Sequence, residues 1–215
     1  MPRPRQPGPR LCTPRVLPLL IRLAWMRESS AAATTWTTPM GDVRELLTEV
    51  RQIERRWQKQ ADIGDESLFA GWMPSDVAQY LVLLIEAIAE APGRGFLEVG
   101  CGPGTKMMLA RDLFGLDVTG FDRVPEFVQA AKEQGLNVAQ CDAFDFQAYG
   151  KFDIVFFNRP FRDRETERDL EKLIYSKVRR GAVVICMNLE TQPPGSKYLV
   201  VTDDWESRRG VWLKL

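Results

Sequence analysis

The sequence predicts an α/β fold, in which short strands alternate with helices around an open and mostly parallel sheet. Apolar runs of strand length recur along the second half of the chain, at residues 96–99, 118–122, 137–143, 152–157 and 182–187. The stretches between them have the three- and four-residue apolar spacing of helices. Polar residues close the first four runs. In a parallel sheet such residues meet along one edge, where open α/β sheets bind ligands.

The first apolar run leads into a loop with almost no side chains. Residues 96–104 are Phe-Leu-Glu-Val-Gly-Cys-Gly-Pro-Gly, with glycines at 100, 102 and 104. Glycine permits positive φ and lets a ligand lie against the backbone amides of the loop and of the following helix. The spacing differs from the G-x-G-x-x-G of dinucleotide-binding loops. Glu98 favours a positively charged ligand over a pyrophosphate, and the alternative for the loop is a tight strand-to-helix connection.

Two acids end the next two strands. Asp122 lies 22 residues after Gly100, where nucleotide-binding βαβ units have an acid that accepts hydrogen bonds from ribose hydroxyls. Asp142 closes the third strand in the same way. A helix cap or a turn explains each acid equally well by itself. Their coordinated placement favours a shared nucleoside site.

The string Glu-Val-Gly-Cys-Gly-Pro-Gly at 98–104, the acid at 122 and the Asp-Ala pair at 142–143 resemble the class I S-adenosylmethionine-dependent methyltransferases. The resemblance covers roughly residues 76–215, about the size of one catalytic domain. It implies a Rossmann-like, seven-stranded and mostly parallel sheet in the order 3-2-1-4-5-7-6, with helices on both faces. It also implies S-adenosyl-L-methionine as the cofactor, and transfer of its methyl group to an acceptor.

The resemblance also implies the residues that contact the cofactor. The glycine loop would pass under the methionine and ribose parts, and Glu98 would fix the loop or assist at the amino end. Asp122 would hold the ribose hydroxyls, Arg123 would lie beside the adenine, and Asp142 would accept from the adenine amino group while Ala143 offers its backbone amide. The full set is Glu98, Gly100, Cys101, Gly102, Gly104, Asp122, Arg123, Asp142 and Ala143.

The segment Asn158-Arg159-Pro160-Phe161 follows the fourth strand, where acceptors enter in this family. It partly resembles the Asn-Pro-Pro-Tyr/Phe motif of enzymes that methylate amide or exocyclic nitrogen. In that motif the Asn and prolyl carbonyls hold the planar amino group. Arg159 stands in place of the first proline, which leaves the acceptor atom open. We expect Asn158, Arg159 and Pro160 to contact the substrate, and the alternative is a rigid loop after the strand.

Composition and pattern divide the chain into three segments. Residues 1–40 hold seven prolines and six arginines against one acid, which predicts a disordered or targeting-like extension. Residues 41–92 predict an N-terminal helical segment, in which Ser75 is the expected N-cap of the second helix. Residues 93–215 are the predicted S-adenosylmethionine-binding methyltransferase core, in which Thr166 is expected to cap the helix after the fourth strand.

Two of these assignments leave alternatives. Residues 1–40 have features of a transit peptide and of a secretory signal, and Met40 stands where translation would otherwise begin. The aromatic side chains of Phe69, Trp72 and Tyr80 are expected either to fix the helices on the sheet or to line the acceptor pocket.

Composition argues against several classes of function. Beyond residue 40 the chain holds 23 basic and 28 acidic residues, a net charge of −5, which argues against broad nucleic-acid binding. The absence of histidine removes Ser-His and Cys-His hydrolase mechanisms. Cysteines at 12, 101, 141 and 186 have no C-x-x-C spacing, so no metal site is expected. No run reaches the about 18 apolar residues of a membrane span, and we expect a soluble, cytoplasmic protein.

Together these observations predict a methyltransferase that uses S-adenosyl-L-methionine to modify a nitrogen or oxygen of a small-molecule or protein acceptor. A non-catalytic protein that senses the cofactor or scaffolds a partner is the alternative from another class. A nicotinamide-dependent reductase conflicts with the glycine spacing and with Glu98. Methyl transfer from a sulfonium needs in-line alignment and exclusion of water more than covalent help, so no catalytic base is assigned. The sequence leaves the acceptor and the oligomeric state open.

Overall fold

The structure is a computed structural model that describes residues 40–61 and 76–215. The predicted extension up to residue 39 lies outside the described residues. So does the linker 62–75, which contains Ser75 and two of the aromatic residues expected near the acceptor. By their contacts, residues 39–215 group as one unit.

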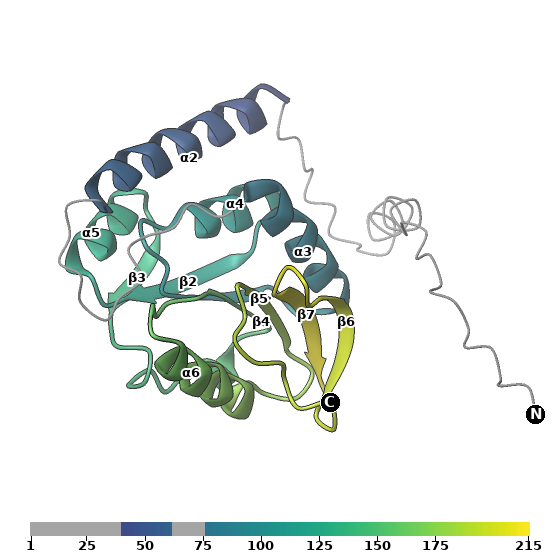
Figure 1. The fold of residues 1–215 in the computed structure, drawn as a ribbon. Helices are drawn as coiled ribbons and strands as arrows, with labels where there is room; N and C mark the ends of the chain where they lie inside the picture. Colours follow the sequence, from purple (N-terminus) through teal and green to yellow (C-terminus); the bar gives the residue numbers. More distant parts are fainter. Residues whose placement is uncertain (1–39, 62–75) are drawn as a thin grey trace, which may run out of the picture. The chain divides into compact units, whose positions relative to one another are not determined.

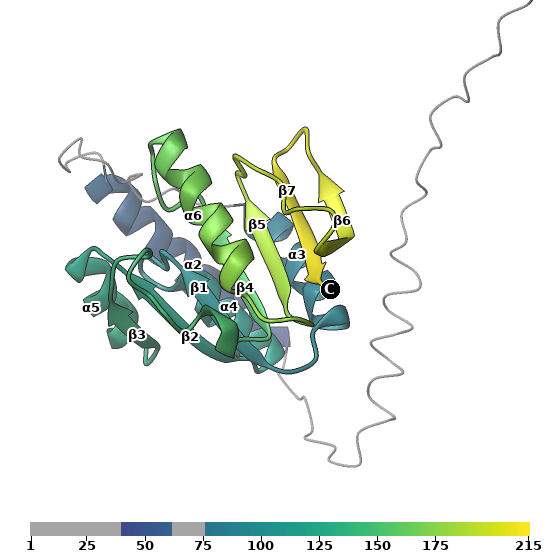
Figure 2. The ribbon, with the colours of Figure 1, turned by 90° about the horizontal axis from the view of Figure 1, so that it is seen from below.

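Seven strands of the described residues form one sheet in the order β3-β2-β1-β4-β5-β7-β6 (Figure 1). The strands are β1 (Gly95–Val99), β2 (Asp117–Asp122), β3 (Asn137–Gln140), β4 (Ile154–Asn158), β5 (Val183–Met187), β6 (Tyr198–Asp204) and β7 (Arg209–Lys214). The first five pair in parallel, and β7 runs antiparallel between β5 and β6. Figure 2 shows β3 at one edge of the sheet and β6 at the other. The predicted sheet and its strand order are confirmed.

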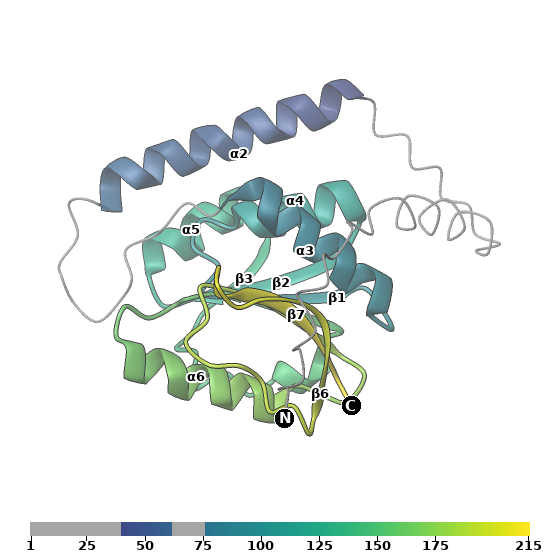
Figure 3. The same ribbon diagram turned by 45° about the vertical axis from the view of Figure 1, so that its right-hand side comes forward.

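Helices cover both faces of the sheet. They are α2 (Met40–Ala61), α3 (Val77–Glu90), α4 (Thr105–Phe114), α5 (Pro125–Glu133) and α6 (Arg164–Lys177), with a short 3-10 helix η1 (Tyr149–Lys151). Figure 3 shows α2, α3, α4 and α5 above the sheet and α6 below it. None of the helices in the described ranges has an apolar stretch long enough to cross a bilayer.

Alternate residues of the central strands build two separate cores. On β4, Ile154 and Phe156 join the cluster under α3 and α4, while Val155 and Phe157 join the cluster under α6. All four side chains are fully buried. Successive side chains of a strand point to opposite faces, and a parallel sheet covered by helices on both sides therefore shows continuous apolar runs rather than alternation.

The N-caps of two helices differ from the prediction. Asp76 caps α3, and its Oδ1 accepts hydrogen bonds from the amides of Ala78 and Gln79. Asp163 caps α6, and its Oδ2 accepts from both the amide and the hydroxyl of Thr166 at 2.7 Å. The prediction of Thr166 as the cap was wrong because a carboxylate three residues upstream already satisfies its amide.

The terminal hairpin extends beyond its apolar residues. β6 continues to Asp204 and β7 begins at Arg209, so the turn occupies residues 205–208. A register shift between Val200 and Thr202 interrupts their pairing. The added residues are polar, and an antiparallel backbone ladder does not require apolar side chains on an edge strand.

Helix α2 joins the sheet domain through contacts with two other helices. Val50 is fully buried in the core. Glu54 accepts from the Lys106 ammonium of α4 at 2.8 Å, with side-chain exposures of 11% and 5%. The ring of Trp57 meets Phe127 of α5 edge-on, with 4.9 Å between centroids. The predicted N-terminal helix therefore supports α4 and α5 from outside.

Replacing Glu54 by Gln is expected to lower the free energy of unfolding by about 3 kcal/mol, because it removes a negative charge that pairs with the buried Lys106 ammonium. Denaturant unfolding followed by circular dichroism measures the change. Glu45→Gln, at an exposed position of the same helix, is the matched control and should leave stability within about 0.5 kcal/mol. Equal stability of the two variants would contradict the prediction.

Candidate functional site

The loop after β1 adopts a backbone conformation that only glycine takes without strain. Gly100, Gly102 and Gly104 have φ values of +67°, +53° and +82°. A Cβ on Gly100 would also come within 3.1 Å of the Pro160 side chain. This loop therefore packs directly against the segment that follows β4, and the two segments predicted to hold cofactor and substrate are neighbours.

Gly104 has a different structural role from the other two glycines. It is the N-cap residue of α4, and a Cβ there would overlap the side chain of Leu136 and lie 3.2 Å from that of Ala131. Gly104 does not line the pocket described below. In this structure its lack of a side chain allows α4 to pack against the segment between α5 and β3.

Asp122 holds three segments together at the end of β2. Its carboxylate accepts from the amide of Gly102 at 2.8 Å and from the amide of Val124 at 2.9 Å. Its backbone carbonyl accepts from Cys141 at 3.0 Å. Burial raises the pKa of Asp122, while these amides lower it. Each carboxylate oxygen can accept a further hydrogen bond, so the turn and a ligand-binding role are compatible.

Asp142, which follows β3, forms an ion pair with Arg123, which follows β2. Arg123 donates to Asp142 Oδ2 at 3.2 Å, and Asp142 Oδ1 accepts from the Phe144 amide at 3.0 Å. The backbone carbonyl of Ala143 accepts from the Tyr149 hydroxyl at 2.8 Å. These bonds fix the turn that carries both residues predicted to meet the adenine.

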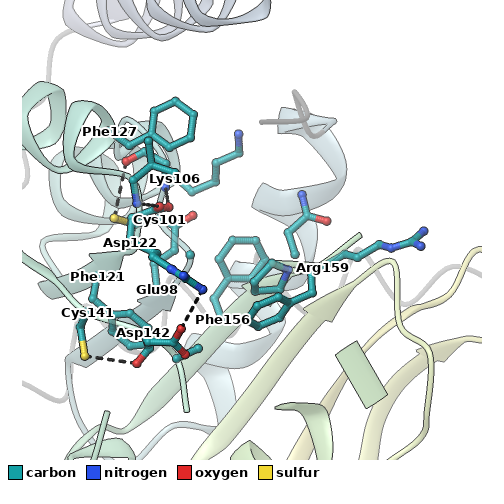
Figure 4. Close-up of a pocket in the computed structure, with 18 residues that line it drawn as sticks. Glu98, Cys101, Lys106, Phe121, Asp122, Phe127, Cys141, Asp142, Phe156 and Arg159 are labelled. Carbon is teal, nitrogen blue, oxygen red and sulfur yellow. Dashed lines mark hydrogen bonds and ion pairs between the residues drawn. The ribbon is translucent and has the colours of Figure 1, made fainter. Parts of the chain in front are cut away.

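The predicted residues meet around one open pocket at the carboxyl edge of the sheet (Figure 4). Eleven of the twelve predicted site residues line it, and Gly104 is the exception. Their binding roles stay predictions, but their convergence in space is observed.

Several residues of the lining were not predicted as site residues. These are Lys106, Phe121, Val124, Phe127, Cys141, Phe156 and Phe161. Phe121, Val124, Cys141 and Phe161 each stand next to a predicted site residue, and this adjacency was the available signal. Lys106 had none, because a lysine in the first turn of a helix is normally solvated. Its burial depends on α2.

Tyr80 proves to be a core residue that supports this pocket. It is fully buried, its hydroxyl donates to the Lys106 carbonyl at 3.0 Å, and its ring lies 4.9 Å from that of Phe156. Of the two alternatives for Tyr80, the structure shows the one in which it fixes a helix on the sheet.

Glu98 is the most perturbed acid of the pocket. Only 5% of the residue is exposed, and burial raises its pKa to about 8 although Lys106 opposes the shift. Within the described residues its Oε2 has no hydrogen-bond partner. Burial also raises the pKa of the Cys101 thiol, which disfavours a nucleophilic thiolate. Among the described side chains, no group has the arrangement of a metal site.

The other end of the pocket is built by the segments after β4 and β5. Asn158 Oδ1 accepts from Asn188 Nδ2 at 2.7 Å, which orients the Asn158 amide. Arg159 has a φ of +48°, and Figure 4 shows its guanidinium directed away from Asp122 and Asp142. The Phe161 amide donates to Glu167 Oε2 at 2.8 Å.

Comparisons with known proteins agree with this arrangement. Residues 91–190 match a family model described as a methyltransferase domain. These residues form a methyltransferase domain. The ribosomal protein L11 methyltransferase of Thermosipho africanus is 29% identical over 123 residues, which are 54% of this chain and 46% of that protein. The chain thus spans less than half of the length of this relative.

A solved methyltransferase structure shares the fold, and a second match is weaker. An RNA methyltransferase from Salinibacter ruber, in complex with S-adenosyl-L-homocysteine, matches with a TM-score of 0.50 at 17% identity, over 65% of this chain and 91% of that chain. Phosphoethanolamine N-methyltransferase 2 of Haemonchus contortus, in complex with S-adenosyl-L-methionine, matches with a TM-score of 0.45 at 26% identity, over 53% and 28%. The first match confirms the class I fold of the methyltransferase domain.

Glu98 makes the folding stability of the methyltransferase domain depend on pH. Its folded-state pKa of about 8 lies above the usual 4.5, so the folded chain keeps a proton that the unfolded chain releases. Stability contributed at this site is therefore lost as pH rises from about 4.5 to 8. Compared with Glu98→Gln, the wild type should lose on the order of a few kcal/mol across this window.

Denaturant unfolding at pH 5, 6, 7 and 8 measures this difference. Glu167 and other acids contribute to both proteins, so the difference between the two curves isolates Glu98. Glu90→Gln, at the exposed end of α3, should follow the wild type. Parallel curves for wild type and Glu98→Gln would show that Glu98 is ionised throughout.

Proposed function

We propose that the chain is a class I methyltransferase that uses S-adenosyl-L-methionine to methylate a nitrogen or oxygen of a small-molecule or protein acceptor. The observation that carries the proposal is the Glu98 carboxylate, buried beside the glycine loop with an oxygen that has no hydrogen-bond partner in the described ranges. Leaving such a group unsatisfied is costly. An ammonium that a ligand brings to this place would favour the ionised form of Glu98 and donate to the unpartnered oxygen, and the cofactor carries an ammonium.

The rest of the pocket supports the same ligand. The bare loop at Gly100 and Gly102 permits close approach of a ligand to backbone. Asp122 retains capacity to accept from ribose hydroxyls. Phe121 and Phe127 add apolar surface to the lining, and the turn at Asp142 and Ala143 presents polar groups to a nucleobase. The residues present therefore fit each part of S-adenosyl-L-methionine.

The chemistry follows from positioning. When bound, the cofactor supplies a methyl group already activated by a sulfonium. The chain's residues bind and orient the cofactor and the acceptor, and they exclude water. Phe156 and Phe161 supply apolar walls, and Asn158 presents an amide that Asn188 holds in place. One lone pair of Asn158 Oδ1 stays available for an N–H or O–H of an acceptor. Alignment of this kind accounts for a large part of such rate enhancements.

We place the protein in a reducing compartment such as the cytoplasm. The three cysteines in the described part of the chain are free thiols, and two of them are buried. Free buried thiols are ordinary in the cytosol, whereas secreted proteins usually pair theirs.

Asp122→Ala is expected to weaken binding of S-adenosyl-L-methionine by about 10- to 100-fold, because it removes charged acceptors for hydroxyls and releases the Gly102 amide. Isothermal titration calorimetry with the cofactor and with S-adenosyl-L-homocysteine measures the affinity. Asp117→Ala, at the exposed opposite end of β2, is the control and should bind as the wild type does. Unchanged affinity in Asp122→Ala would count against the site.

Catalysis is tested separately from binding. A labelled-methyl assay with amine, amide, hydroxyl and carboxylate acceptors, both free and in peptides, should detect transfer with at least one class. Binding of the cofactor without transfer to any of them would favour the alternative, a sensor or scaffold. Failure to bind S-adenosyl-L-methionine at all would refute both.

A further inference from the structure

The acceptor end of the pocket is bordered by backbone strain. Within the described residues, three non-glycine residues have positive φ: Arg159 at +48°, Asn188 at +60° and Arg208 at +53°. They follow β4, follow β5 and precede β7, which are neighbours in the sheet. Such a conformation is unfavourable for a residue with a side chain and persists only where the surroundings fix it, often at functional sites. The structure therefore concentrates strain at one corner, beside the pocket.

Three arginines meet at this corner over one buried carboxylate. Arg208 donates to Glu190 Oε2 at 2.8 Å, and Arg159 and Arg164 each lie 3.7 Å from Glu190 Oε1. The Glu190 side chain is 1% exposed, whereas those of Arg159, Arg164 and Arg208 are 23%, 64% and 36% exposed. The negative group is thus inside and the positive groups reach the solvent.

Among the described residues, the three arginines form ion pairs with Glu190 alone. Glu167 and Glu171 lie beneath them, both fully buried, and burial raises their pKa values to about 8 and about 7. Their oxygens also accept backbone amides, from Phe161 for Glu167 and from Glu190 and Thr191 for Glu171. The exposed Asp163 is engaged as the cap of α6.

We propose that Arg159, Arg164 and Arg208 form an anion-binding subsite for the acceptor, which therefore carries a carboxylate or phosphate group near the atom that is methylated. This inference rests on the proposed function. Arg159 lines the same pocket as Asn158, and its guanidinium lies on the side away from Asp122 (Figure 4). The subsite thus borders the acceptor half of the pocket.

The chemistry of the three guanidinium groups favours the binding of an anion. A guanidinium presents five N–H donors in a planar fork that matches carboxylate and phosphate oxygens. At 3.7 Å, the contacts of Arg159 and Arg164 with Glu190 are too long to be hydrogen bonds. These two guanidiniums therefore gain attraction from Glu190 without using their donors on it. Arg159 Nη2 donates to the Arg162 carbonyl at 3.1 Å, and both side chains stay partly in solvent. A purely structural ion network would instead show only the non-saturating screening that any added salt produces.

The test is a titration of the ¹⁵N-labelled full chain, saturated with S-adenosyl-L-homocysteine, with inorganic phosphate and separately with acetate. Nuclear magnetic resonance follows the arginine Nε–Hε signals at constant ionic strength, balanced with chloride. Each signal is identified by its loss in Arg159→Gln, Arg164→Gln or Arg208→Gln. We expect the three signals to shift together with one saturable dissociation constant. The tighter of the two probes tells whether the group is a phosphate or a carboxylate.

Variants that are expected to change the dissociation constant of phosphate in opposite directions sharpen the test. Arg159→Gln and Arg208→Gln should each raise the dissociation constant of phosphate about tenfold. Glu190→Gln should lower it, because it removes the competing negative charge while keeping the shape of the side chain. Arg168→Gln, exposed on α6, is the control and should leave it unchanged. Thermal melting and S-adenosyl-L-homocysteine affinity near wild-type values show that each variant is folded.

Shifts that do not saturate, that chloride reproduces, or that the arginine substitutions leave unchanged would overturn the proposal. Calorimetry with S-adenosyl-L-homocysteine reports on the proposed function independently. If that ligand does not bind, the methyltransferase proposal fails, and the same titration of the chain alone still decides whether the three arginines hold an anion.

Discussion

The geometry of the pocket depends on the Asp122 carboxylate. It joins the glycine loop to the start of α5, while the carbonyl of the same residue holds the segment after β3. Three segments far apart in sequence are therefore fixed by one buried acid at the end of β2. The same acid is the proposed ribose ligand. Its structural and binding roles are thus coupled, and any ligand that contacts it meets a prearranged loop.

Buried acids organise the acceptor end in the same manner. Glu167 accepts from the Phe161 amide, and Glu171 accepts from the amides of Glu190 and Thr191. Glu167 and Glu171 both belong to α6, which packs under the sheet and so brings their carboxylates to this end of the pocket. Backbone amides in loops must find acceptors when they are buried, and here carboxylates provide them at both ends of the pocket.

The methyltransferase domain is also supported by a helix outside residues 91–190. Glu54 of α2 pairs with Lys106, and Trp57 packs against Phe127, and both partners line the pocket. Neither contact was foreseen, because the apolar stripe of α2 predicts burial of one face but not its partner. Charged residues near that stripe looked like a solvated surface.

Patterns in the amino-acid sequence predict the strands, their order through the family resemblance, and eleven of the eighteen residues that line the pocket. These features follow from local signals, because apolar runs, glycine spacing and acids at strand ends each involve only a few neighbouring residues. Only the tertiary structure decided that Gly104 serves packing, that Lys106 is buried, and that three arginines converge on Glu190. The environment of a charge or of a missing side chain depends on segments distant in the chain, so no local pattern encodes it.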